Sequence, residues 1–336
     1  MRVTRLLRLG VIAALMLSAT ANASAALPAP LADLQMRLAI ATQHAPGRVA
    51  VAIEDLATGA ISGINPNASM PAASTIKIPV MVEVFRQMSE GRVDLGQVVH
   101  LTARDRDWGW GSLCDAPLGT GYSVQTLLWR MITDSDNTAT NMLIRLVGRQ
   151  HINATMSDLG LLHTRVADYI RSDGDIRSLR SSAGDMLHLL DAMARDELVD
   201  PWSSRQMIAI MEGQRHNTLL PVPLPKELKI AHKTGSLHDT LNDVGIVESE
   251  REPYVIAVMT TGLPTLDTGR RFIRGVSWLA YQAMERFADW RAENGLAPVE
   301  QLTHPTLSSP DLQRWLSPSQ EPAAPPATQE PPPQNQ

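Results

Sequence analysis

Residues 71–81 read Pro-Ala-Ala-Ser-Thr-Ile-Lys-Ile-Pro-Val-Met, and they place a serine and a lysine three positions apart, Ser74 and Lys77. On a helix, side chains at this spacing lie on the same face and within reach of one another. A serine hydroxyl is a poor nucleophile until a neighbouring base removes its proton. Ser74 and Lys77 are therefore a candidate nucleophile and its base.

Lys77 can act as a base only if its surroundings keep the amine neutral. An unperturbed lysine has a pKa near ~10.4 and is charged at neutral pH. Burial beside another cation lowers that pKa, and Lys233 is the candidate cation. If Ser74 lies near a helix N-terminus, the helix dipole and the N–H of Ser74 can stabilise an oxyanion.

A second motif, Ser135-Asp136-Asn137, follows one predicted helix and begins another. Ser135 can relay a proton between Lys77 and a leaving nitrogen. The amide of Asn137 can donate to a substrate carbonyl and accept from a lysine. Asp136 is a good helix N-cap, so this residue is expected to have a structural role.

A third motif, Lys233-Thr234-Gly235, lies on a predicted strand. Gly235 has no side chain, so a substrate can run alongside the backbone as an added strand. Lys233 and Thr234 are expected to meet a substrate carboxylate, and the N–H of Ser236 is the second candidate oxyanion donor. Each motif alone arises by chance, but the three in this order form a specific signal.

Together the motifs resemble those of the class A β-lactamase family and related serine hydrolases, which share a fold with D,D-peptidases. The resemblance covers residues 31 to about 290. It implies an α/β (α+β) fold of the β-lactamase/transpeptidase type, with an antiparallel sheet flanked by helices and an all-helical lobe. It also implies a set of catalytic residues, Ser74, Lys77 and Ser135, and a set of substrate-binding residues, Asn137, Lys233, Thr234, Gly235 and Ser236.

The sequence departs from the family pattern at one catalytic position. Class A β-lactamases carry a Glu-x-x-Leu-Asn loop, whose glutamate activates the water that hydrolyses the acyl-enzyme. The expected region, residues 164–176, has no glutamate, and alignment puts Ile170 in its place. Three aspartates in this region are candidate bases for that water, although each is equally consistent with a loop hydrogen bond or cap: Asp168, Asp173 and Asp175.

Two further features of the family have several candidates here. The arginine that usually assists carboxylate binding has no match on the strand after the third motif, where Asp243 stands. Three arginines of the last predicted helix can replace it: Arg270, Arg271 and Arg274. Trp108 or Trp110 can form an aromatic wall at the mouth of the cleft. His232 is expected to point away from Lys233, because side chains alternate along a strand.

The order of predicted elements supports the same architecture. A helix is predicted at 31–44, strands at 48–53 and 60–64, and then a long helix-rich stretch. Ser123 and Asp200 are expected to cap helices, and Pro79 to introduce a slight kink if its helix is already under way at that point. Strands at 229–234, 243–247 and 254–260 and an amphipathic helix at 269–287 follow. We therefore expect the first strands to pair with the last ones in one sheet.

The two ends of the chain differ from this region in composition. Residues 1–25 have a basic start, a short apolar stretch and small residues at a cleavage site, as a secretory signal peptide does. We predict a catalytic domain over residues 26–305 and a disordered Pro/Gln-rich tail over residues 306–336. The protein is therefore expected to be periplasmic or secreted, without a membrane span.

Composition also excludes several classes of function. The net charge of −5 does not favour nucleic acid as a partner. The nine histidines show no metal-ligand spacing, and Cys114 is the sole cysteine, so neither a metal site nor a cofactor is predicted. A small-molecule substrate and a monomeric enzyme are the expectation.

The function predicted from these residues is a serine hydrolase that opens the β-lactam ring through an acyl-Ser74 intermediate. Deacylation is the step for which the sequence supplies no evident base. One alternative is a D,D-carboxypeptidase or penicillin-binding amide hydrolase that acts on D-Ala-D-Ala-like cell-wall peptides. Another is a sensor domain that β-lactams acylate without turnover.

Overall fold

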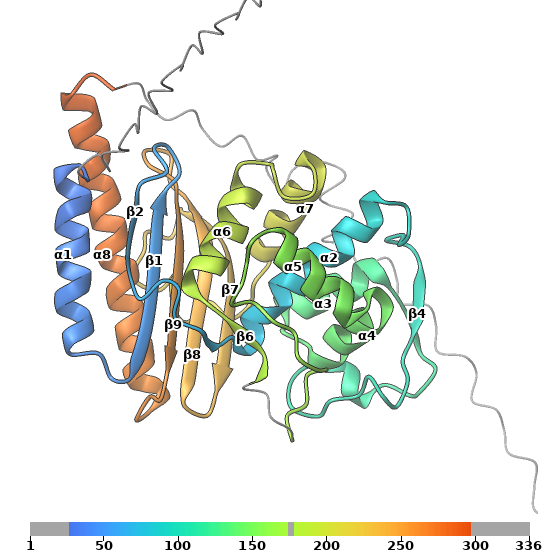
Figure 1. Cartoon of the computed structure of the whole chain (residues 1–336). Helices are drawn as coiled ribbons and strands as arrows, with labels where there is room; N and C mark the ends of the chain where they lie inside the picture. The colour runs from blue at the N-terminus through green and yellow to red at the C-terminus, as the bar shows by residue number, and fades with distance from the viewer. Residues whose placement is uncertain (1–26, 174–177, 297–336) are drawn as a thin grey trace, which may run out of the picture.

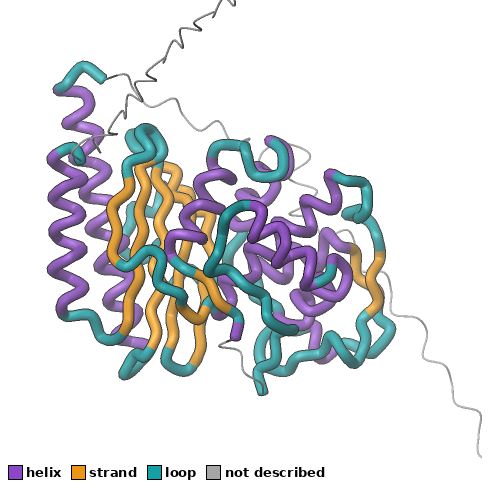
Figure 2. Tube along the Cα trace, viewed as in Figure 1, coloured by secondary structure: helices purple, strands orange, loops and turns teal. Residues whose placement is uncertain are grey.

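The computed structural model describes residues 27–173 and 178–296. Within these ranges, strands from both ends of the chain form an antiparallel sheet in the order β2-β1-β9-β8-β7 (Figures 1 and 2). The predicted pairing of the first strands with the last ones is therefore confirmed. The strands of this sheet are β1 Arg48–Asp55, β2 Ile61–Ile64, β7 Lys229–Leu237, β8 Thr240–Glu248 and β9 Tyr254–Thr261.

Helices cover both faces of the sheet. Figure 1 shows α1 (Ala29–Gln43) beside α8 (Leu266–Glu293) on one face, and a lobe of helices on the other. The helices of this lobe are α2 Lys77–Ser89, α3 Val124–Thr133, α4 Asn137–Val147, α5 Arg149–Asp158, α6 Ala183–Ala194 and α7 Pro201–Glu212. The expected fold class, an antiparallel sheet with flanking helices and a helical lobe, is confirmed.

Alternation along β1 divides the core between these two layers. Val51 and Ile53 pack with α1 and α8, whereas Ala50 and Ala52 face the helical lobe. Successive side chains on a strand point to opposite faces of the sheet, so β1 contributes residues to the hydrophobic core on each face. The small alanines let α6 pack directly against β1 and its neighbours.

The predicted helix caps are confirmed, and they fix where several helices begin. The side chains of Ser123, Asp136 and Asp200 each accept a backbone N–H from the first turn of their helix. Thr265 caps α8 in the same way, so this helix starts at Leu266, earlier than the sequence pattern indicated.

The effect expected of Pro79 depends on where its helix begins. Helix α2 begins at Lys77, so Pro79 lies in its first turn. Backbone N–H groups in the first turn have no partner within the helix, and a proline there removes no hydrogen bond. The condition for a kink, a helix already under way before Pro79, is therefore not met.

Short elements connect the two lobes. Strand β3 (Met70–Pro71) pairs with β6 (Arg180–Ser181), and the 3-10 turn η1 (Ala73–Ile76) follows β3 and leads into α2. The remaining short elements are β4 Val98–His100, η2 Leu113–Asp115 and β5 Gly121–Ser123. The chain thus passes from sheet to helical lobe at the point where the first motif stands.

The predicted signal peptide and Pro/Gln-rich tail lie outside the described residues, so the domain limits stay predictions. Within residues 27–173 and 178–296, no helix combines the length and the hydropathy that crossing a bilayer requires.

The packing of α1 on the sheet generates a stability prediction. Leu34 is fully buried in α1, whereas Ile40 in the same helix is 53% exposed. We expect Leu34→Ala to lower the free energy of unfolding by about 2–5 kcal/mol, because it removes buried methyl groups and leaves a cavity. Ile40→Ala should change it by less than about 1 kcal/mol. Urea unfolding followed by circular dichroism compares the two, and equal losses would contradict the packing described.

Candidate active site

The three motifs converge on one hydroxyl group. Ser135 lies just before α4, and its Oγ is 3.1 Å from the Nζ of Lys77 and 3.1 Å from the Nζ of Lys233. Lys77 begins α2 and Lys233 lies on β7, so three separate elements supply these groups. Segments far apart in the sequence therefore form a common site between the sheet and the helical lobe.

The backbone before Ser74 is held by the sheet. Asn242 of β8 donates from its amide to the carbonyl oxygens of Pro71 and Ala72, at 2.9 and 3.0 Å. Its Oδ1 accepts the N–H of Thr260 on β9, at 2.9 Å. No role for Asn242 could be predicted from the sequence, because its position within a run of strand residues carries no local signal. In the structure it fixes the entry to the first motif.

Strain also marks this segment. Ala73, directly before Ser74, has a φ of +48°, and Ser135 has a φ of +59°. Residues other than glycine rarely occupy this left-handed region, and they do so where the surrounding structure imposes it. Both motifs therefore have a constrained backbone beside the side chains that meet in the site.

Gly235 allows β7 to approach the first motif closely. A Cβ at this position would lie 2.9 Å from the oxygen of Ala72 and 3.1 Å from the nitrogen of Ser74. Any side chain would push the two segments apart. The glycine that was predicted to leave room for a substrate strand thus also brings the strand next to Ser74.

Lys77 has no exposed surface, and its Nζ has three polar neighbours. These are the backbone oxygen of Ser135 at 2.5 Å, the hydroxyl of Ser135 at 3.1 Å and the Oδ1 of Asn137 at 2.8 Å. Nζ is placed to donate to each of these oxygens, and the neutral amine has two N–H donors and one lone pair, the lone pair being what a base needs to take a proton.

The electrostatic surroundings favour the neutral form of Lys77. Burial lowers the pKa of the amine well below its ordinary value, and the neighbouring charge of Lys233 lowers it further. Asp136 and Asp107 act in the opposite direction. This is the environment that the sequence analysis required for a lysine base.

Lys233 is buried as completely as Lys77. Its Nζ donates to the Oγ of Ser135 and to the backbone oxygen of Thr234, at 3.1 and 3.0 Å. Burial lowers the pKa of Lys233 to about 7, against the opposing charge of Asp243. His232 lies on the other face of the strand, as predicted, where Nδ1 contacts Asp243 at 2.9 Å.

A cleft of about 620 Å³ opens above these groups. Its lining includes Ser74 together with Ser135 and Asn137 of the second motif and Thr234 and Ser236 of the third. None of the described residues that line it is an aspartate or a glutamate. The other lining residues are Gly109, Trp110, Ser172, His216, Thr218, Leu219, Leu237, His238, Leu241, Leu266 and Arg270.

Neither of the two candidate deacylation bases within the described residues, Asp168 and Asp173, lines this cleft. Asp168 has a side chain that is 69% exposed and lies 3.5 Å from the guanidinium of Arg149. Asp173 is exposed and is not part of the cleft lining, and Asp175 lies outside the described residues. Ile170 is buried, and its backbone N–H and carbonyl both bond to the side chain of Asn141.

Of the three candidate arginines, Arg270 lines the cleft. Arg271 pairs instead with Asp267 in the same helix, and Arg274 donates to the backbone oxygen of Thr218 at 2.8 and 3.1 Å. The helical period separates neighbouring positions by about 100°. The three arginines therefore leave α8 in different directions and contact different parts of the structure.

Of the two candidate tryptophans, Trp110 lines the cleft. Its ring packs edge-on against His216, with ring centroids 5.5 Å apart, and its indole N–H donates to the oxygen of Asp134 at 3.0 Å. Trp108 is 67% exposed and packs against the guanidinium of Arg106. The aromatic wall is therefore built by Trp110.

A buried carboxylate that the sequence analysis missed supports the second motif. Asp107 accepts the amide of Asn137 at 2.8 Å and the N–H and hydroxyl of Ser172 at 2.7 and 3.0 Å. Burial opposes its ionisation, but the hydrogen bonds from Asn137, Ser172 and Gly109 outweigh burial and hold the pKa of Asp107 below its usual value. In the Asp-Trp-Gly-Trp-Gly sequence the tryptophans were the visible signal, and nothing in it marked Asp107 as a supporting residue.

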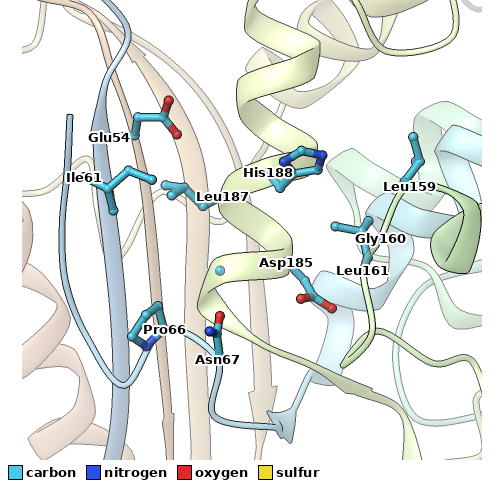
Figure 3. A pocket seen from close by; sticks show the side chains of 11 residues that line it. Glu54, Ile61, Pro66, Asn67, Leu159, Gly160, Leu161, Asp185, Leu187 and His188 are labelled. Atoms are coloured by element: carbon cyan, nitrogen blue, oxygen red, sulfur yellow. The ribbon is translucent and has the colours of Figure 1, made fainter. Parts of the chain in front are cut away.

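A second hollow, of about 350 Å³, lies away from the three motifs (Figure 3). Two of its carboxylates already have partners. Asp185 accepts from Ser182 and Thr164, and Glu54 lies 3.5 Å from Arg195. Figure 3 shows these side chains on β1 and α6, with apolar residues between them. This hollow lacks the serine–lysine arrangement that makes the first cleft a candidate site.

The fold and the motifs can be compared with known proteins. The family model of the β-lactamase enzyme family, Beta-lactamase2, matches residues 33–284. Extended-spectrum β-lactamase PER-1 of Pseudomonas aeruginosa is 25% identical over 236 residues, which are 65% of this chain and 77% of the relative. β-Lactamase AST-1 of Nocardia asteroides is 27% identical over 225 residues, covering 64% of this chain and 71% of the relative.

Solved structures agree with this assignment. The structure of PBP-A superimposes with a TM-score of 0.72 at 31% identity, and covers 76% of this chain and 96% of its own. A leucine-to-glutamate mutant of PBP-A, solved as an acyl-enzyme complex with penicillin G, gives a TM-score of 0.73 at 30% identity, covering 77% of this chain and 100% of its own. The chain therefore belongs to the β-lactamase enzyme family, and it is a serine hydrolase of that type.

Proposed function

We propose that this protein reacts with β-lactams through an acyl-Ser74 intermediate, and that it releases the acyl group slowly. The observation that carries this proposal is the Ser135 hydroxyl, held 3.1 Å from two buried lysine amines beneath a cleft lined by Ser74. The cleft has the groups that acylation needs, but the described residues that line it supply no carboxylate for water.

Acylation follows from the protonation states of these groups. The neutral amine of Lys77 takes the proton of the Ser74 hydroxyl while Oγ attacks the carbonyl carbon of the lactam. The N–H groups of Ser74 and Ser236 are the proposed donors to the oxyanion. When the C–N bond breaks, the proton passes from Lys77 through the hydroxyl of Ser135 to the leaving nitrogen.

Binding of the substrate is assigned to the remaining residues of the second and third motifs and to Arg270 of the cleft lining. We propose that Lys233, Thr234 and Arg270 meet the substrate carboxylate, since a carboxylate prefers cationic and hydroxyl donors. Asn137 presents its amide to the substrate carbonyl, and the backbone at Gly235 runs beside the substrate.

Slow release is proposed because Ile170, a buried residue, stands by alignment where the family carries its glutamate. A general base must lie within hydrogen-bond reach of the water that it activates. The side chain of Ile170 cannot accept a proton, and Asp168 is directed to solvent beside Arg149. The absence of a carboxylate from the described cleft lining also favours a second candidate function, a D,D-peptidase acting on cell-wall peptides that β-lactams inhibit.

The location of the protein is part of the same proposal. The order of basic residues, apolar stretch and cleavage site in residues 1–25 supports export to the periplasm or medium. Both candidate substrates, β-lactams and cell-wall peptides, are met in that compartment. Action as a monomer remains a prediction of the sequence analysis.

The nucleophile can be tested by mass. Incubation of the mature protein with a chromogenic cephalosporin should give one stoichiometric burst of colour and a persistent adduct in the intact mass. Ser74→Ala should abolish both, because no other residue is assigned to attack the lactam. If the Ser74→Ala variant still gained the mass of the β-lactam, the assignment of Ser74 as the nucleophile would be refuted. Rapid continuous turnover by the wild type would instead show efficient deacylation, and release of D-alanine from a cell-wall peptide would support the peptidase function.

The position of Ile170 generates a second prediction. Ile170→Glu should speed loss of the acyl adduct at least tenfold, since a positioned general base contributes about 10²–10⁴-fold. Ile170→Gln is the matched control, because it has a similar shape and cannot act as a base. Decay of the adduct is followed by mass after removal of free β-lactam. Equal decay rates for the two variants would show that this position does not face the acyl group.

The assignment of the cleft arginine gives a third prediction. Arg270→Ala should raise the β-lactam concentration that gives half-maximal acylation rate by about tenfold, as expected for the loss of one charge-assisted hydrogen bond. Arg271→Ala removes the same charge from the Asp267 pair and should leave this concentration within about twofold of wild type. Stopped-flow acylation kinetics give both values, and matching effects would remove Arg270 from the substrate site.

A further inference from the structure

The hydrogen bonds of Asp107 extend the site beyond the three motifs. We propose that Asp107 is a positioning residue for acylation, which orients the amide of Asn137 and ties it to the loop that carries Ser172. This inference rests on the proposed function, since it concerns the same reaction. Asp107 is 3% exposed and is not part of the cleft lining, so it acts through its neighbours.

An ionised carboxylate determines which end of the Asn137 amide faces it. Asp107 has acceptors alone when it is charged, so the NH2 group of Asn137 must point towards it, at 2.8 Å. The Oδ1 of Asn137 is then directed to the Nζ of Lys77, at 2.8 Å. Reversing the amide would set its NH2 against the amine and its oxygen against the carboxylate. One N–H of Asn137 remains for a ligand in the cleft.

The carboxylate of Asp107 is occupied on both oxygens. Oδ1 accepts from Asn137 and from the N–H of Gly109, at 2.8 and 3.0 Å. Oδ2 accepts from the N–H and the hydroxyl of Ser172, at 2.7 and 3.0 Å. A carboxylate with four donors in place is stabilised as an anion, and it has little tendency to take a proton from water. Asp107 is therefore a positioning group and not the missing base.

The backbone around Asp107 supports the same residues. The oxygen of Trp110 accepts the N–H of Asn137 at 2.9 Å, so this segment holds both the side chain and the main chain of Asn137. A Cβ on Gly109 would lie 2.4 Å from the Cβ of Ser172. The segment and the loop thus pack directly against each other, with Asp107 bonded to both.

The charge of Asp107 also acts on Lys77. The charged groups that act on Lys77 are Lys233 of β7, Asp136 at the start of α4 and Asp107. His216 of the cleft lining is the further titratable group nearby, and burial together with the charges of Lys233 and Lys77 lowers its pKa. The negative charge of Asp107 favours the ammonium form and raises the pKa of Lys77 relative to a neutral residue. A plot of acylation rate against pH rises on its acidic side, here called the acid limb, as Lys77 loses its proton. Removing the charge of Asp107 lowers the pKa of Lys77 and should therefore shift this acid limb to lower pH, even while the rate at the optimum falls.

A double-mutant cycle tests the proposal. The variants are Asp107→Asn, Asn137→Ala and the double mutant, and the measurement is the second-order acylation rate constant for a fluorescent penicillin between pH 5 and pH 9 (about the working range of a lysine base). We expect Asp107→Asn to lower the constant at the optimum about 10- to 100-fold and to move the acid limb to lower pH. Asn137→Ala and the double mutant should be equally slow, because Asp107 acts through Asn137.

Two controls make the result specific. Asp115→Asn is the same substitution at an exposed position of the neighbouring turn, and it should leave the rate and the pH profile unchanged. Ser172→Ala removes one donor to Asp107 but keeps its charge, so the acid limb should stay in place. If Asp107→Asn does not fold, Asp107→Ser keeps an acceptor for the N–H of Gly109 while it removes the charge.

The outcomes separate this inference from the proposed function. Additive effects in the cycle, or an acid limb that does not move, would overturn the role of Asp107 while the wild type still forms its adduct. Absence of any adduct on the wild type would overturn the proposed function itself. If Asp107→Asn lowered the acylation rate but left the acid limb in place, Asp107 would have a structural role only.

Discussion

The contact on which the rest of the site depends is the one between the Ser135 hydroxyl and two buried amines. Lys77 and Lys233 approach the same oxygen from different elements, and neither side chain has any exposed surface. Two charged ammonium groups in this position would repel each other in a medium that screens them poorly. Burial and this proximity therefore favour the neutral form of at least one amine, which is the form that the proposed base needs.

This contact between Ser135 and the two lysines depends on several features of the fold. β7 must approach the first motif, which Gly235 permits, and the chain before Ser74 must be held against the sheet, which Asn242 achieves. The strained backbone at Ala73 and Ser135 is maintained by the same packing. Local strain and a desolvated charge each cost free energy, and the two hydrophobic layers on either side of the sheet offset these costs.

Much of this could be predicted from the sequence, and the failures have a physical cause. Periodicity and capping residues predicted the sheet, the main helices and the helix starts at Ser123 and Asp200. The supporting groups could not be found in this way, because Asn242 and Asp107 act on residues that are distant in the chain. Arg270 could be distinguished from Arg271 and Arg274 only by the direction in which each leaves α8.

The separation between acylation and deacylation follows from the architecture. The groups for acylation come from η1, α2, α4 and β7, whose relative positions the sheet and the helical core determine. The region around Ile170 belongs to a surface loop, anchored by Asn141 and, through Ser172, by Asp107. A substitution in that loop can remove the general base that activates the deacylating water without disturbing the groups for acylation. Under the proposed function, the residues shared with the β-lactamase family form the acyl-enzyme, whereas the loop around Ile170 determines how long it lasts.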